Sequence, residues 1–319
     1  MKEFLYKYCI PTAKFKIFDN PKDAISYVEK ENKPFVVKTD GLASGKGAIV
    51  GKNVEETLNA IQRIMIKKEF GDAGNKIVVE DVLTGIEVSV FIVTDGKNYK
   101  WLGTAQDHKR VYDFDEGPNT GGMGSYSPVP FINENIKYVI EENIIKNTIN
   151  GLRKENAVYK GILYIGLMIT EFGPAVLEYN VRFGDPEAQS ILPLLETDFV
   201  EIANAVIDER LFNLNIKHYN GYCCSVVMAS EGYPGSYSKG YEITGDLDDE
   251  SNVFVFHAGT KKLNSKYFTD GGRVLCVSAL GRTLKEAIDN SYSKIYKIHF
   301  TGAHYRKDIG YKGLTYSNK

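Results

Sequence analysis

The sequence predicts an α+β protein in which helices and strands follow one another along the whole chain. Stretches with apolar residues three or four positions apart begin at polar capping residues, as expected of helices that pack one face on a core. Between them lie short runs rich in valine and isoleucine, bounded by glycine, asparagine or proline, as expected of strands. Several of these runs are joined by tight turns, which predicts antiparallel pairing.

The composition is that of an ordinary globular protein. The chain has 319 residues, 43% hydrophobic and 25% charged, which is enough for two or three domains. Its 39 basic and 41 acidic residues leave a formal charge of -2, which argues against a basic nucleic-acid-binding surface. No apolar run has the length of a membrane span or the place of a signal peptide. We therefore expect a cytoplasmic protein that binds neither nucleic acid nor membrane.

The first half of the chain begins with two predicted helices. Asn20 and Pro21 open a helix that extends to about Glu31. Asn53 opens a second helix, which ends near the basic pair at 67–68. Strands are then predicted over 76–83, 85–94 and 99–105, the last two joined by a turn at 95–96. Residues 113–130 show no periodicity, which predicts a long glycine-rich loop of the kind that is usually functional or disordered.

The second half begins with a long amphipathic helix, predicted over about 134–156. Strands over 161–170 and 175–183 follow, and then a helix that Thr197 and Asp198 open.

A polar, aperiodic stretch over 209–222 predicts a domain boundary near residue 212. Beyond it, strands are predicted within 223–230, 252–259 and 271–280, before a helix that Thr283 and Glu286 open as a capping box. The four cysteines have no metal-ligand spacing, so we expect free thiols that are mostly buried.

A glycine-rich turn carries two lysines in FVVKTDGLASGKGAIV, residues 35–50. It is not a P-loop, because Gly47 rather than a hydroxyl residue follows Lys46 and because the flanking runs predict two strands rather than a strand and a helix. The backbone N–H groups that glycines expose, together with Lys38 and Lys46, can bind an anion such as a nucleotide phosphate. The alternative is a surface hairpin with solvated lysines.

A second candidate site lies in LEYNVR, residues 177–182. On a strand, Glu178, Asn180 and Arg182 project from one face. A carboxylate and an amide oxygen side by side can bind Mg²⁺, which keeps water and phosphate as its other ligands. Arg182 would then be placed to steady a transferred phosphoryl group. The alternative is a polar strand face with an internal ion pair between glutamate and arginine.

A third candidate site lies in EDVLTGIE, residues 80–87. Glu80 and Glu87 flank a short connection, and a carboxylate can accept hydrogen bonds from two ribose hydroxyls. Val82 and Leu83 offer backbone groups and apolar surface suited to an adenine ring. The alternative is that both acids are solvated, as acids at strand ends usually are.

Together, these three segments resemble the ATP-grasp ligases. Five longer motifs narrow the resemblance: QDHKR (106–110), GPNTGGMGSYSP (117–128), RFGDPEAQ (182–189), HAGTK (257–261) and GGRVLCVSALG (271–281). With these motifs the chain resembles the phosphoribosylamine-glycine ligases, also called glycinamide ribonucleotide synthetases. The resemblance extends from IPTAKF (10–15) to RKDIG (306–310). RFGDPE with glutamine at the eighth position is a signature of that family.

The resemblance implies an ATP-grasp fold, in which two α+β lobes grip a nucleotide, followed by a smaller C-terminal α/β domain. We therefore expect an ATP-grasp domain over 1–212, with a small flap lobe over about 1–80 and a larger lobe over about 81–212. The C-terminal domain is expected over 213–319.

The resemblance also implies a reaction. ATP would phosphorylate glycine, and the amine of 5-phosphoribosylamine would attack the glycyl phosphate, to give glycinamide ribonucleotide, ADP and phosphate in purine biosynthesis. A carboxylate is a poor electrophile until one oxygen becomes a leaving group, and the approach of an anion to a polyanion requires cations.

By the same resemblance, each site residue receives an expected role. The phosphates of ATP are held by Lys38, Gly45, Lys46 and Gly47. The adenosine lies at Glu80, Val82, Leu83 and Glu87. Glu178 and Asn180 bind Mg²⁺ or Mn²⁺, and the ligands of a second metal are left open. Arg182 and Asp185 belong to the substrate-facing motif, and Asp107, His108, Lys109 and Arg110 border the pocket for glycine and phosphoribosylamine. For His108, positioning by hydrogen bonds is preferred to a role as general base.

Members of the family carry a further N-terminal α/β domain before the segment that matches IPTAKF. We therefore expect one of two situations: a truncated chain with an incomplete phosphoribosylamine site and impaired activity, or a separately supplied N-terminal domain as a partner that completes this site. Two alternative functions remain: another ATP-grasp ligase that joins a different carboxylate and amine, or a nucleotide-binding remnant without turnover.

Overall fold

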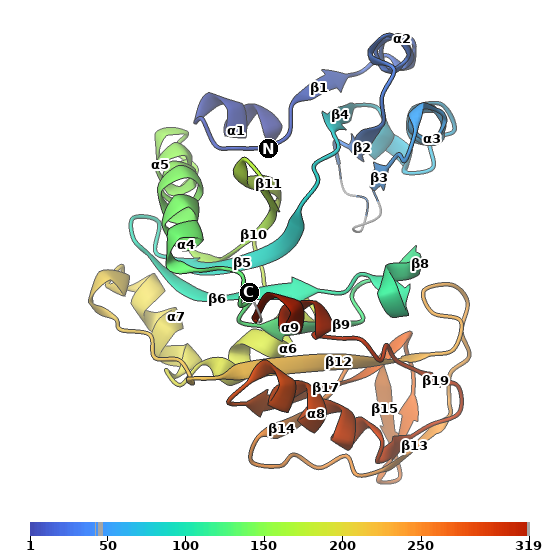
Figure 1. The fold of residues 1–319 in the computed structure, drawn as a ribbon, viewed down its shortest axis with the longest axis vertical. Helices are drawn as coiled ribbons and strands as arrows, with labels where there is room; N and C mark the ends of the chain where they lie inside the picture. Colours follow the sequence, from blue (N-terminus) through green and yellow to red (C-terminus); the bar gives the residue numbers. More distant parts are fainter. Residues whose placement is uncertain (42, 44–46, 318–319) are drawn as a thin grey trace. The chain divides into compact units, whose positions relative to one another are not determined.

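A computed structural model describes residues 1–41, 43 and 47–317. The chain forms two compact units (Figure 1). Unit 1 comprises Met1–Ile86 and Met168–Leu177, and unit 2 comprises Glu87–Leu167 and Glu178–Lys319. The first boundary lies close to the end of the expected flap lobe. Residues 213–319 belong to unit 2, so the separate C-terminal domain stays a prediction. Among the described residues, no helix is long and apolar enough to cross a membrane.

Unit 1 contains a four-stranded sheet with the strand order β1-β4-β2-β3. The strands are β1 (Phe15–Phe18), β2 (Phe35–Thr39), β3 (Ala48–Val50) and β4 (Ile77–Asp81). β2 and β3 pair antiparallel with Val37 opposite Ile49, which confirms the predicted hairpin. β4 pairs antiparallel with both β1 and β2.

The helices of unit 1 begin where the capping residues predicted. The side chain of Asn20 accepts a hydrogen bond from the backbone of Lys22 and opens α2 (Pro21–Glu31). Asn53 accepts one from Glu56 and opens α3 (Val54–Ile61), which continues as a π-helical turn (Gln62–Ile66). Val28 and Ile61 of these helices belong to one buried cluster with Phe35 and Val79 of the sheet. Two short helices, α1 (Lys2–Lys7) and a 3₁₀ turn (Gly71–Gly74), were not predicted.

A nine-stranded sheet provides the framework of unit 2. Its strand order is β11-β10-β5-β6-β9-β12-β17-β14, with β19 paired to β12. The strands are β5 (Ile86–Thr94), β6 (Tyr99–Asp107), β9 (Gly124–Ser127), β10 (Gly161–Thr170), β11 (Gly173–Asn180), β12 (Tyr222–Ser230), β14 (Val253–His257), β17 (Arg273–Gly281) and β19 (Ala303–His304). β5 and β6 pair antiparallel with Thr94 opposite Tyr99, which confirms the turn predicted at 95–96.

The prediction of a structureless loop over 113–130 is wrong. A 3₁₀ turn (Asp113–Asp115) and β8 (Glu116–Asn119), which pairs with β7 (Arg110–Tyr112), occupy its first part. β9 occupies its second part and pairs with β6 and β12. The segment has no apolar alternation because small residues in β9 are buried inside the sheet, and pattern analysis does not detect a strand of that kind.

The long helix predicted over 134–156 is confirmed, with an irregular middle. It consists of α4 (Glu134–Ile140), a π-helical turn (Glu141–Ile145) and α5 (Lys146–Lys154). Ile140 and Ile144 are fully buried.

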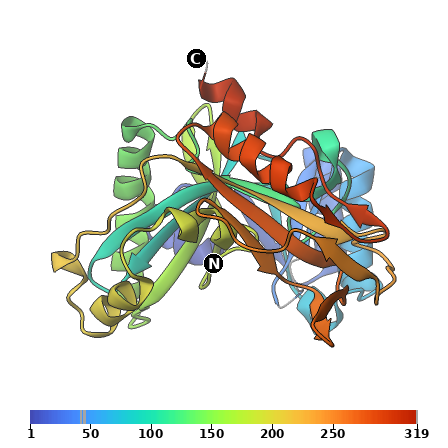
Figure 2. The ribbon, with the colours of Figure 1, turned by 90° about the horizontal axis from the view of Figure 1, so that it is seen from below.

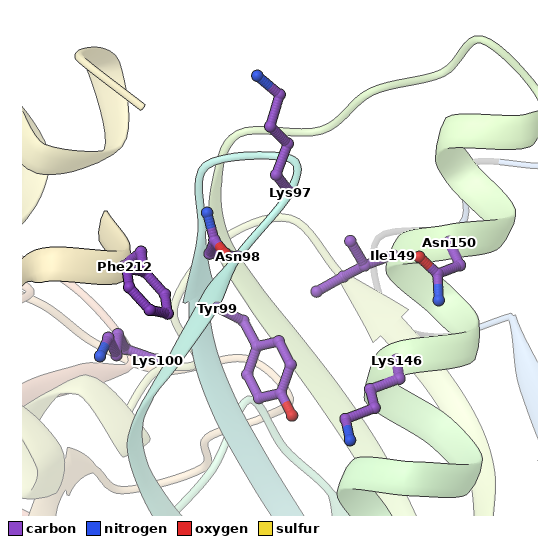
Figure 3. A pocket seen from close by; sticks show the side chains of 8 residues that line it. All are labelled: Lys97, Asn98, Tyr99, Lys100, Lys146, Ile149, Asn150 and Phe212. Atoms are coloured by element: carbon purple, nitrogen blue, oxygen red, sulfur yellow. The ribbon is translucent and has the colours of Figure 1, made fainter. Parts of the chain in front are cut away.

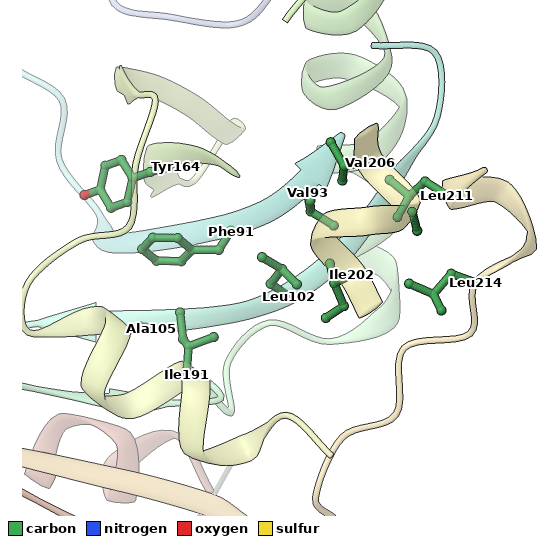
Figure 4. Packing of buried hydrophobic residues seen from close by; sticks show 11 residues of the cluster. Phe91, Val93, Leu102, Ala105, Tyr164, Ile191, Ile202, Val206, Leu211 and Leu214 are labelled. Carbon is green, nitrogen blue, oxygen red and sulfur yellow. The ribbon is translucent and has the colours of Figure 1, made fainter. Parts of the chain in front are cut away.

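A hydrophobic cluster joins β5 and β6 to two further helices of unit 2 (Figure 4). α7 (Phe199–Ile207) begins at Asp198, whose side chain accepts from the backbone of Val200, as the sequence predicted. α6 (Glu187–Ile191), which lies within the RFGDPEAQ motif, was not predicted. Phe91, Leu102, Ile191 and Ile202 are among the buried residues that meet in this cluster. The polar stretch near 212 contains a 3₁₀ turn (Leu211–Asn213) whose Leu211 and Leu214 are buried in the same cluster.

The C-terminal part of unit 2 contains the strands predicted there and several that were missed. β12 and β17 pair antiparallel, and α8 (Leu284–Ile295) lies along them, as the red helix in Figure 2 shows. Thr283 accepts from the backbone of Glu286, while the Glu286 carboxylate accepts from the backbone of Arg282, so α8 is capped much as predicted. The missed elements are β13 (Glu242–Gly245), β15 (Thr260–Leu263), β16 (Lys266–Thr269), β18 (Ile298–His299), α9 (Tyr311–Ser317) and a 3₁₀ turn (Leu192–Leu194).

Two details bear on the predicted sites. β11 ends at Asn180, so Arg182 does not continue the strand face of Glu178, contrary to the expected strand over 175–183. The cysteines are free thiols: Cys9 is exposed and the other three are buried, as predicted.

Candidate functional site

In unit 1, Lys38 lies on β2 and its ammonium group is held by two oxygens. Lys38 Nζ is 2.5 Å from Glu80 Oε1 and donates a hydrogen bond to the Leu177 carbonyl at 3.0 Å. Its side chain is 22% exposed, in contrast to the buried side chain of Glu80. Gly47 closes the hairpin by accepting from the backbone of Thr39, and a methyl group on Gly47 would overlap Thr39 Oγ1. Gly45 and Lys46 lie outside the described residues.

Glu80 is buried, which was not expected of a ribose ligand. Its carboxylate is 2% exposed and forms ion pairs with Lys38 and with Lys2 of α1. The structure therefore brings together two residues to which the sequence assigned separate parts of the nucleotide. Val82 and Leu83 are half-buried in the connection after β4. A ribose contact by Glu80 stays a prediction, and it would have to compete with these two ion pairs.

In unit 2, the QDHKR motif lies at the end of β6. The backbone N–H of His108 donates to the Gly124 carbonyl, and that of Met123 donates to the His108 carbonyl, so the turn is held against β9. Asp107 Oδ1 is buried and accepts no hydrogen bond from any residue that the structure describes. Burial, and then the charge of Glu187, raise the pKa of Asp107 well above its ordinary value.

His108 and Lys109 have different environments. The His108 ring is 1% exposed, its Nδ1 lies 3.2 Å from the Gly124 carbonyl, and its Nε2 has no partner among the described residues. Burial, and then the positive charge of Arg306, lower the pKa of His108 to about 4. Lys109 Nζ pairs with Glu87 Oε1 at 2.5 Å. Burial, the largest single influence, lowers the pKa of Lys109, but Glu87, Tyr164 and Asp107 together raise it above its ordinary value.

Burial and the lowered pKa make the ring of His108 neutral at ordinary pH, and its role in positioning by hydrogen bonds stays a prediction. It also places Glu87 beside Lys109. Glu87, which was expected at the adenosine, thus pairs with a residue that was expected at the substrates. The sequence did not predict that contact.

Glu187 was not singled out from the sequence, although it is the last residue of RFGDPE. Its side chain is buried and accepts a hydrogen bond from Ser89 Oγ at 3.3 Å. Burial raises the pKa of this carboxyl group as well. A methyl group on Gly184 would overlap Glu187 Oε2, so the carboxyl group folds over backbone that only glycine leaves open. One role of the RFGDPE motif is therefore to leave space in which the carboxyl group of Glu187 is buried.

Three motifs that are far apart in the sequence meet at Gly122. Its φ of +118° favours glycine, and a methyl group there would overlap Pro186 Cδ and lie 2.9 Å from Asp107 Oδ1. Ser125 Oγ donates to the Pro186 carbonyl at 2.9 Å. The glycine-rich segment thus packs directly against QDHKR and RFGDPE.

Arg273, from the GGRVLCVSALG motif, holds this junction together. Its guanidinium group donates to the carbonyls of Gly121 and Asp185 at 2.9 and 2.7 Å, and it pairs with the Asp185 carboxylate at 3.2 Å. The phenol oxygen of Tyr233 accepts from the backbone of Gly121. Asp185, expected to face substrate, is exposed and also accepts from Gln189. Arg273 was within a quoted motif, but its spacing gave no signal of this role.

Arg182 and Arg110 point to backbone in the structure. Arg182 Nη1 donates to the Phe183 carbonyl at 2.7 Å, and Arg110 Nη1 donates to the Gly117 carbonyl at 2.6 Å. Both side chains are exposed. Their expected substrate contacts stay predictions.

A fully buried arginine supports the same region from the RKDIG motif. Arg306 donates to the carboxylates of Asp115 and Asp308 and to the Arg110 carbonyl. Asp308 also accepts from the backbone of Phe114, which has a left-handed φ of +57°. Arg306 therefore ties the β7–β8 hairpin to the C-terminal end of unit 2.

The predicted metal ligands lie at the end of β11. Glu178 is exposed and Asn180 half-buried, and Asn180 Nδ2 lies 3.3 Å from Glu178 Oε1. Adjacent carboxylate and amide groups that are open to solvent fit a Mg²⁺ ion that takes its remaining oxygens from water and phosphate. No cluster of three or more His, Cys, Asp or Glu suited to a metal is found among the described residues.

A hollow of about 420 Å³ in unit 2 lies away from these residues (Figure 3). Lys97, Tyr99, Lys146 and Phe212 are among the residues that line it. Its ammonium groups on Lys97 and Lys146 are already paired with glutamates. None of the predicted site residues lines this hollow.

Comparison with known proteins identifies the family. The model of the phosphoribosylglycinamide synthetase ATP-grasp (A) domain matches residues 1–188, and the model of the C domain matches residues 223–312. This chain belongs to the phosphoribosylglycinamide synthetase family. The family predicted from the motifs is thereby confirmed. The two matches leave 189–222 between them, the region in which the sequence predicted a domain boundary.

Two single-function relatives of this phosphoribosylglycinamide synthetase family member carry the name phosphoribosylamine-glycine ligase. The protein of Caldanaerobacter subterraneus is 47% identical over 308 residues, and that of Clostridium acetobutylicum is 45% identical over 309. Each match covers 97% of this chain and 74% of the relative. The trifunctional purine biosynthetic protein adenosine-3 of Gallus gallus is 49% identical, over 99% of this chain and 33% of the relative. The chain thus spans about a third of the trifunctional relative and about three quarters of the others.

Solved structures confirm the α+β ATP-grasp fold of the family member. Phosphoribosylamine-glycine ligase from Thermotoga maritima matches with a TM-score of 0.86 and 38% identity, over 97% of this chain and 77% of that one. Biotin carboxylase from Campylobacter jejuni matches with a TM-score of 0.74 at 13% identity, over 98% of this chain and 68% of that one. The second likeness shows the fold alone.

Proposed function

We propose that this chain catalyses the ATP-dependent ligation of glycine to 5-phosphoribosylamine through a glycyl phosphate. The relatives named phosphoribosylamine-glycine ligase, to which it is 45% and 47% identical, support this activity. The same comparison supports glycine and phosphoribosylamine as substrates and ATP as the phosphate donor. We place the reaction in the cytoplasm, as the sequence predicted.

The observation that carries the proposal is the junction at Gly122 in unit 2. There, residues of QDHKR, GPNTGGMG, RFGDPE and GGRVLCVSALG are in contact or joined by hydrogen bonds. A ligase acting on another pair of substrates would share the ATP-grasp fold but would not require these four motifs to meet. The junction also contains the buried Asp107 Oδ1, which has no hydrogen-bond partner among the described residues and therefore keeps hydrogen-bonding capacity for a polar group of a ligand.

The chemistry assigns tasks to the residues of the chain. The amine that forms the amide must lose a proton, and Asp107, whose pKa is raised by burial, is suited to accept it. Lys38, whose side chain is 22% exposed, supplies positive charge for a phosphate. Lys109 orients Glu87 by the ion pair between them.

Glu178 and Asn180 would hold Mg²⁺ or Mn²⁺. When bound, the ion would neutralise phosphate charge and favour attack by a carboxylate.

The test is an assay of ADP release. Purified chain is incubated with MgATP, glycine and freshly prepared 5-phosphoribosylamine, and each component is omitted in turn. We expect ADP release that requires both glycine and the amine. Turnover with other carboxylates or amines only would indicate another ATP-grasp ligase, and nucleotide binding without turnover would indicate a binding remnant.

If the complete mixture gives no turnover, the assay is repeated with the N-terminal domain of a relative added as a separate polypeptide. Recovery of glycine-dependent turnover would support the predicted partner domain. Failure in both forms, with nucleotide bound, would contradict the proposed activity.

A further inference from the structure

Three charged side chains of unit 1 form two ion pairs that share one carboxylate. Lys2, from α1, and Lys38, from β2, lie on the two oxygens of the Glu80 carboxylate. The side chains of Lys2 and Glu80 are only 3% and 2% exposed, whereas that of Lys38 is 22% exposed. Lysine and glutamate are almost never buried to this extent without a partner. We call these three residues the Lys2–Glu80–Lys38 triad.

Lys2 is held in place by contacts with other residues of unit 1, and these contacts leave its ammonium group no room to bind a nucleotide. Its ammonium group donates to Thr12 Oγ1 at 2.5 Å, and Thr12 in turn donates to the Val176 carbonyl at 2.7 Å. It also lies 5.9 Å from the centre of the Phe15 ring. Desolvation by burial is the largest influence on Lys2 and lowers its pKa, although the negative charge of Glu80 opposes this effect. The ammonium group of Lys2 therefore interacts with Glu80 of the triad and not with solvent.

The charge of the triad depends on Lys2. Glu80 and Lys38 alone form a neutral pair, in which the carboxylate cancels the positive charge that a phosphate would meet. With Lys2 on the second carboxylate oxygen, the triad carries one net positive charge, and Lys38 has the most exposed of the three side chains. In a weakly solvated site, one unit of charge has a large effect on the binding of a polyanion.

A purely structural role is the competing explanation, since Lys2 also joins α1 to the sheet through Thr12. Burying an ion pair is, however, a costly way to join two elements, and apolar residues of similar size often do so equally well. If the site binds an anion, the buried Lys2 and Glu80 are useful, because together with Lys38 they give the triad a net positive charge.

We propose that Lys2 is a positioning residue for nucleotide binding, which neutralises the second oxygen of Glu80 and so leaves the Lys38 ammonium group with net charge for a phosphate of ATP. The inference rests on the proposed function only in taking ATP as the ligand. It adds to the nucleotide site a residue of α1 that makes no contact with the nucleotide itself.

The test compares binding of the non-hydrolysable ATP analogue AMP-PNP, with Mg²⁺, and of adenosine. Lys2→Met removes the charge at similar side-chain length. We expect the Kd for AMP-PNP, measured by calorimetry, to rise about tenfold and the Kd for adenosine to stay unchanged. Lys30→Met, at an exposed position of α2, is the matched control and should bind both ligands like the wild type.

A double variant separates charge from structure. In Lys2→Met/Glu80→Gln, the buried carboxylate is also removed, so Lys38 regains its full charge while the amide oxygen of the substituted side chain can still accept from it. We expect the Kd for AMP-PNP to return to within about threefold of the wild-type value. A structural role for Lys2 predicts no such rescue, because the contact between α1 and the sheet is still missing.

The outcomes distinguish this inference from the proposed function. If the wild type does not bind AMP-PNP, nucleotide binding itself is wrong and the inference falls with it. If the wild type binds and Lys2→Met binds equally well, or loses AMP-PNP and adenosine in equal proportion, only the inference is overturned. Should Lys2→Met not fold, the double variant decides: wild-type affinity supports the inference, and a tenfold loss overturns it.

Discussion

Asp107 and His108 are sequence neighbours that the structure treats in opposite ways. Asp107 is an acid whose pKa is raised by burial, and His108 is a base whose pKa is lowered by burial. In both cases the low-dielectric surroundings favour the neutral form. Asp107 Oδ1 and His108 Nε2 are also both buried polar atoms for which the described residues provide no partner. The first is suited to proton transfer, and the second contributes mainly to the pH dependence of stability.

We expect Asp107→Asn to lower turnover by roughly 10²–10⁴-fold, because a proton acceptor is lost. At pH 7, the free energy of unfolding should be unchanged or higher by about 1 kcal/mol, because a buried, unpaired carboxylate is removed. The sign follows from the raised pKa: in the wild type, the penalty of this group is full at pH values above its folded pKa and is relieved as the pH falls from that value towards the ordinary pKa of 3.8.

Steady-state turnover and urea unfolding measure the two effects. Asp208→Asn, at an exposed position, is the control and should leave turnover unchanged. A variant of Asp107 with the wild-type rate would contradict the assignment of the proton acceptor.

We expect His108→Asn to flatten the decline of stability in mild acid. The pKa of His108 is about 4 in the folded chain and 6.5 in its ordinary state, so the unfolded chain takes up a proton that the folded chain does not. The stabilising difference is full above pH 6.5 and is lost as the pH falls towards 4, by about 3 kcal/mol in total. Urea unfolding at about pH 7, 5.5 and 4.5 should show this decline in the wild type and a smaller one in the variant. Equal declines in the two proteins would show that folding does not lower the pKa of His108.

At the scale of elements, the β10–β11 hairpin presents two glutamates in different settings. Glu178 lies near the end of β11 beside Asn180, and a methyl group on Gly166 of β10 would lie 3.0 Å from Glu178 Cγ. Glu171 lies in the exposed turn between the strands. A strand face holds a metal ligand in a defined direction, whereas a turn does not.

We expect Glu178→Gln to lower turnover by roughly 10²–10³-fold at saturating Mg²⁺, because an anionic metal ligand is lost. Thermal unfolding should be nearly unchanged, since the side chain is exposed. Glu171→Gln, in the same hairpin, should keep the wild-type rate. If the variant of Glu178 also works at that rate, the metal ligand has been assigned to the wrong residue.

At the scale of the whole molecule, the junction at Gly122 depends on chain segments that are far apart in sequence. Arg273 reaches across 152 positions to Gly121 and 88 positions to Asp185, and Arg306 reaches across 191 positions to Asp115. Such contacts form only after the strands of unit 2 have paired. The site is therefore a property of the assembled sheet and not of any one motif.

We expect Gly122→Ala to lower both stability and turnover, and Gly173→Ala to provide the control. Both glycines have a left-handed φ, of +118° and +110°, which costs an alanine about 1–2 kcal/mol. A methyl group on Gly173 meets nothing within 4 Å, whereas one on Gly122 overlaps Pro186 and Asp107. The extra loss in Gly122→Ala, about 1–3 kcal/mol in urea unfolding, measures the overlap alone. Equal losses in the two variants would mean that the junction is loose.

Helices and strands with strong local signals could be predicted from the amino-acid sequence. Caps at Asn20, Asn53, Asp198 and Thr283 predicted helix starts that the structure shows, because capping satisfies backbone groups within a few residues. The alternation of residues and the tight turn at 95–96 predicted β5 and β6, because these signals also lie within a few residues of one another. The motifs also determined the family and the ATP-grasp fold.

The pairing of charged residues and the burial of small residues became known from the tertiary structure and could not be predicted. β9 was missed because its core contacts are made by residues without a local apolar pattern, and β11 was predicted too long because nothing local ends it at Asn180. Glu80 and Glu87 have the same local setting, but one is buried between two lysines and the other is exposed beside Lys109. Burial and ion pairing depend on what the rest of the chain places nearby, and that information is not contained in the spacing of residues along one segment.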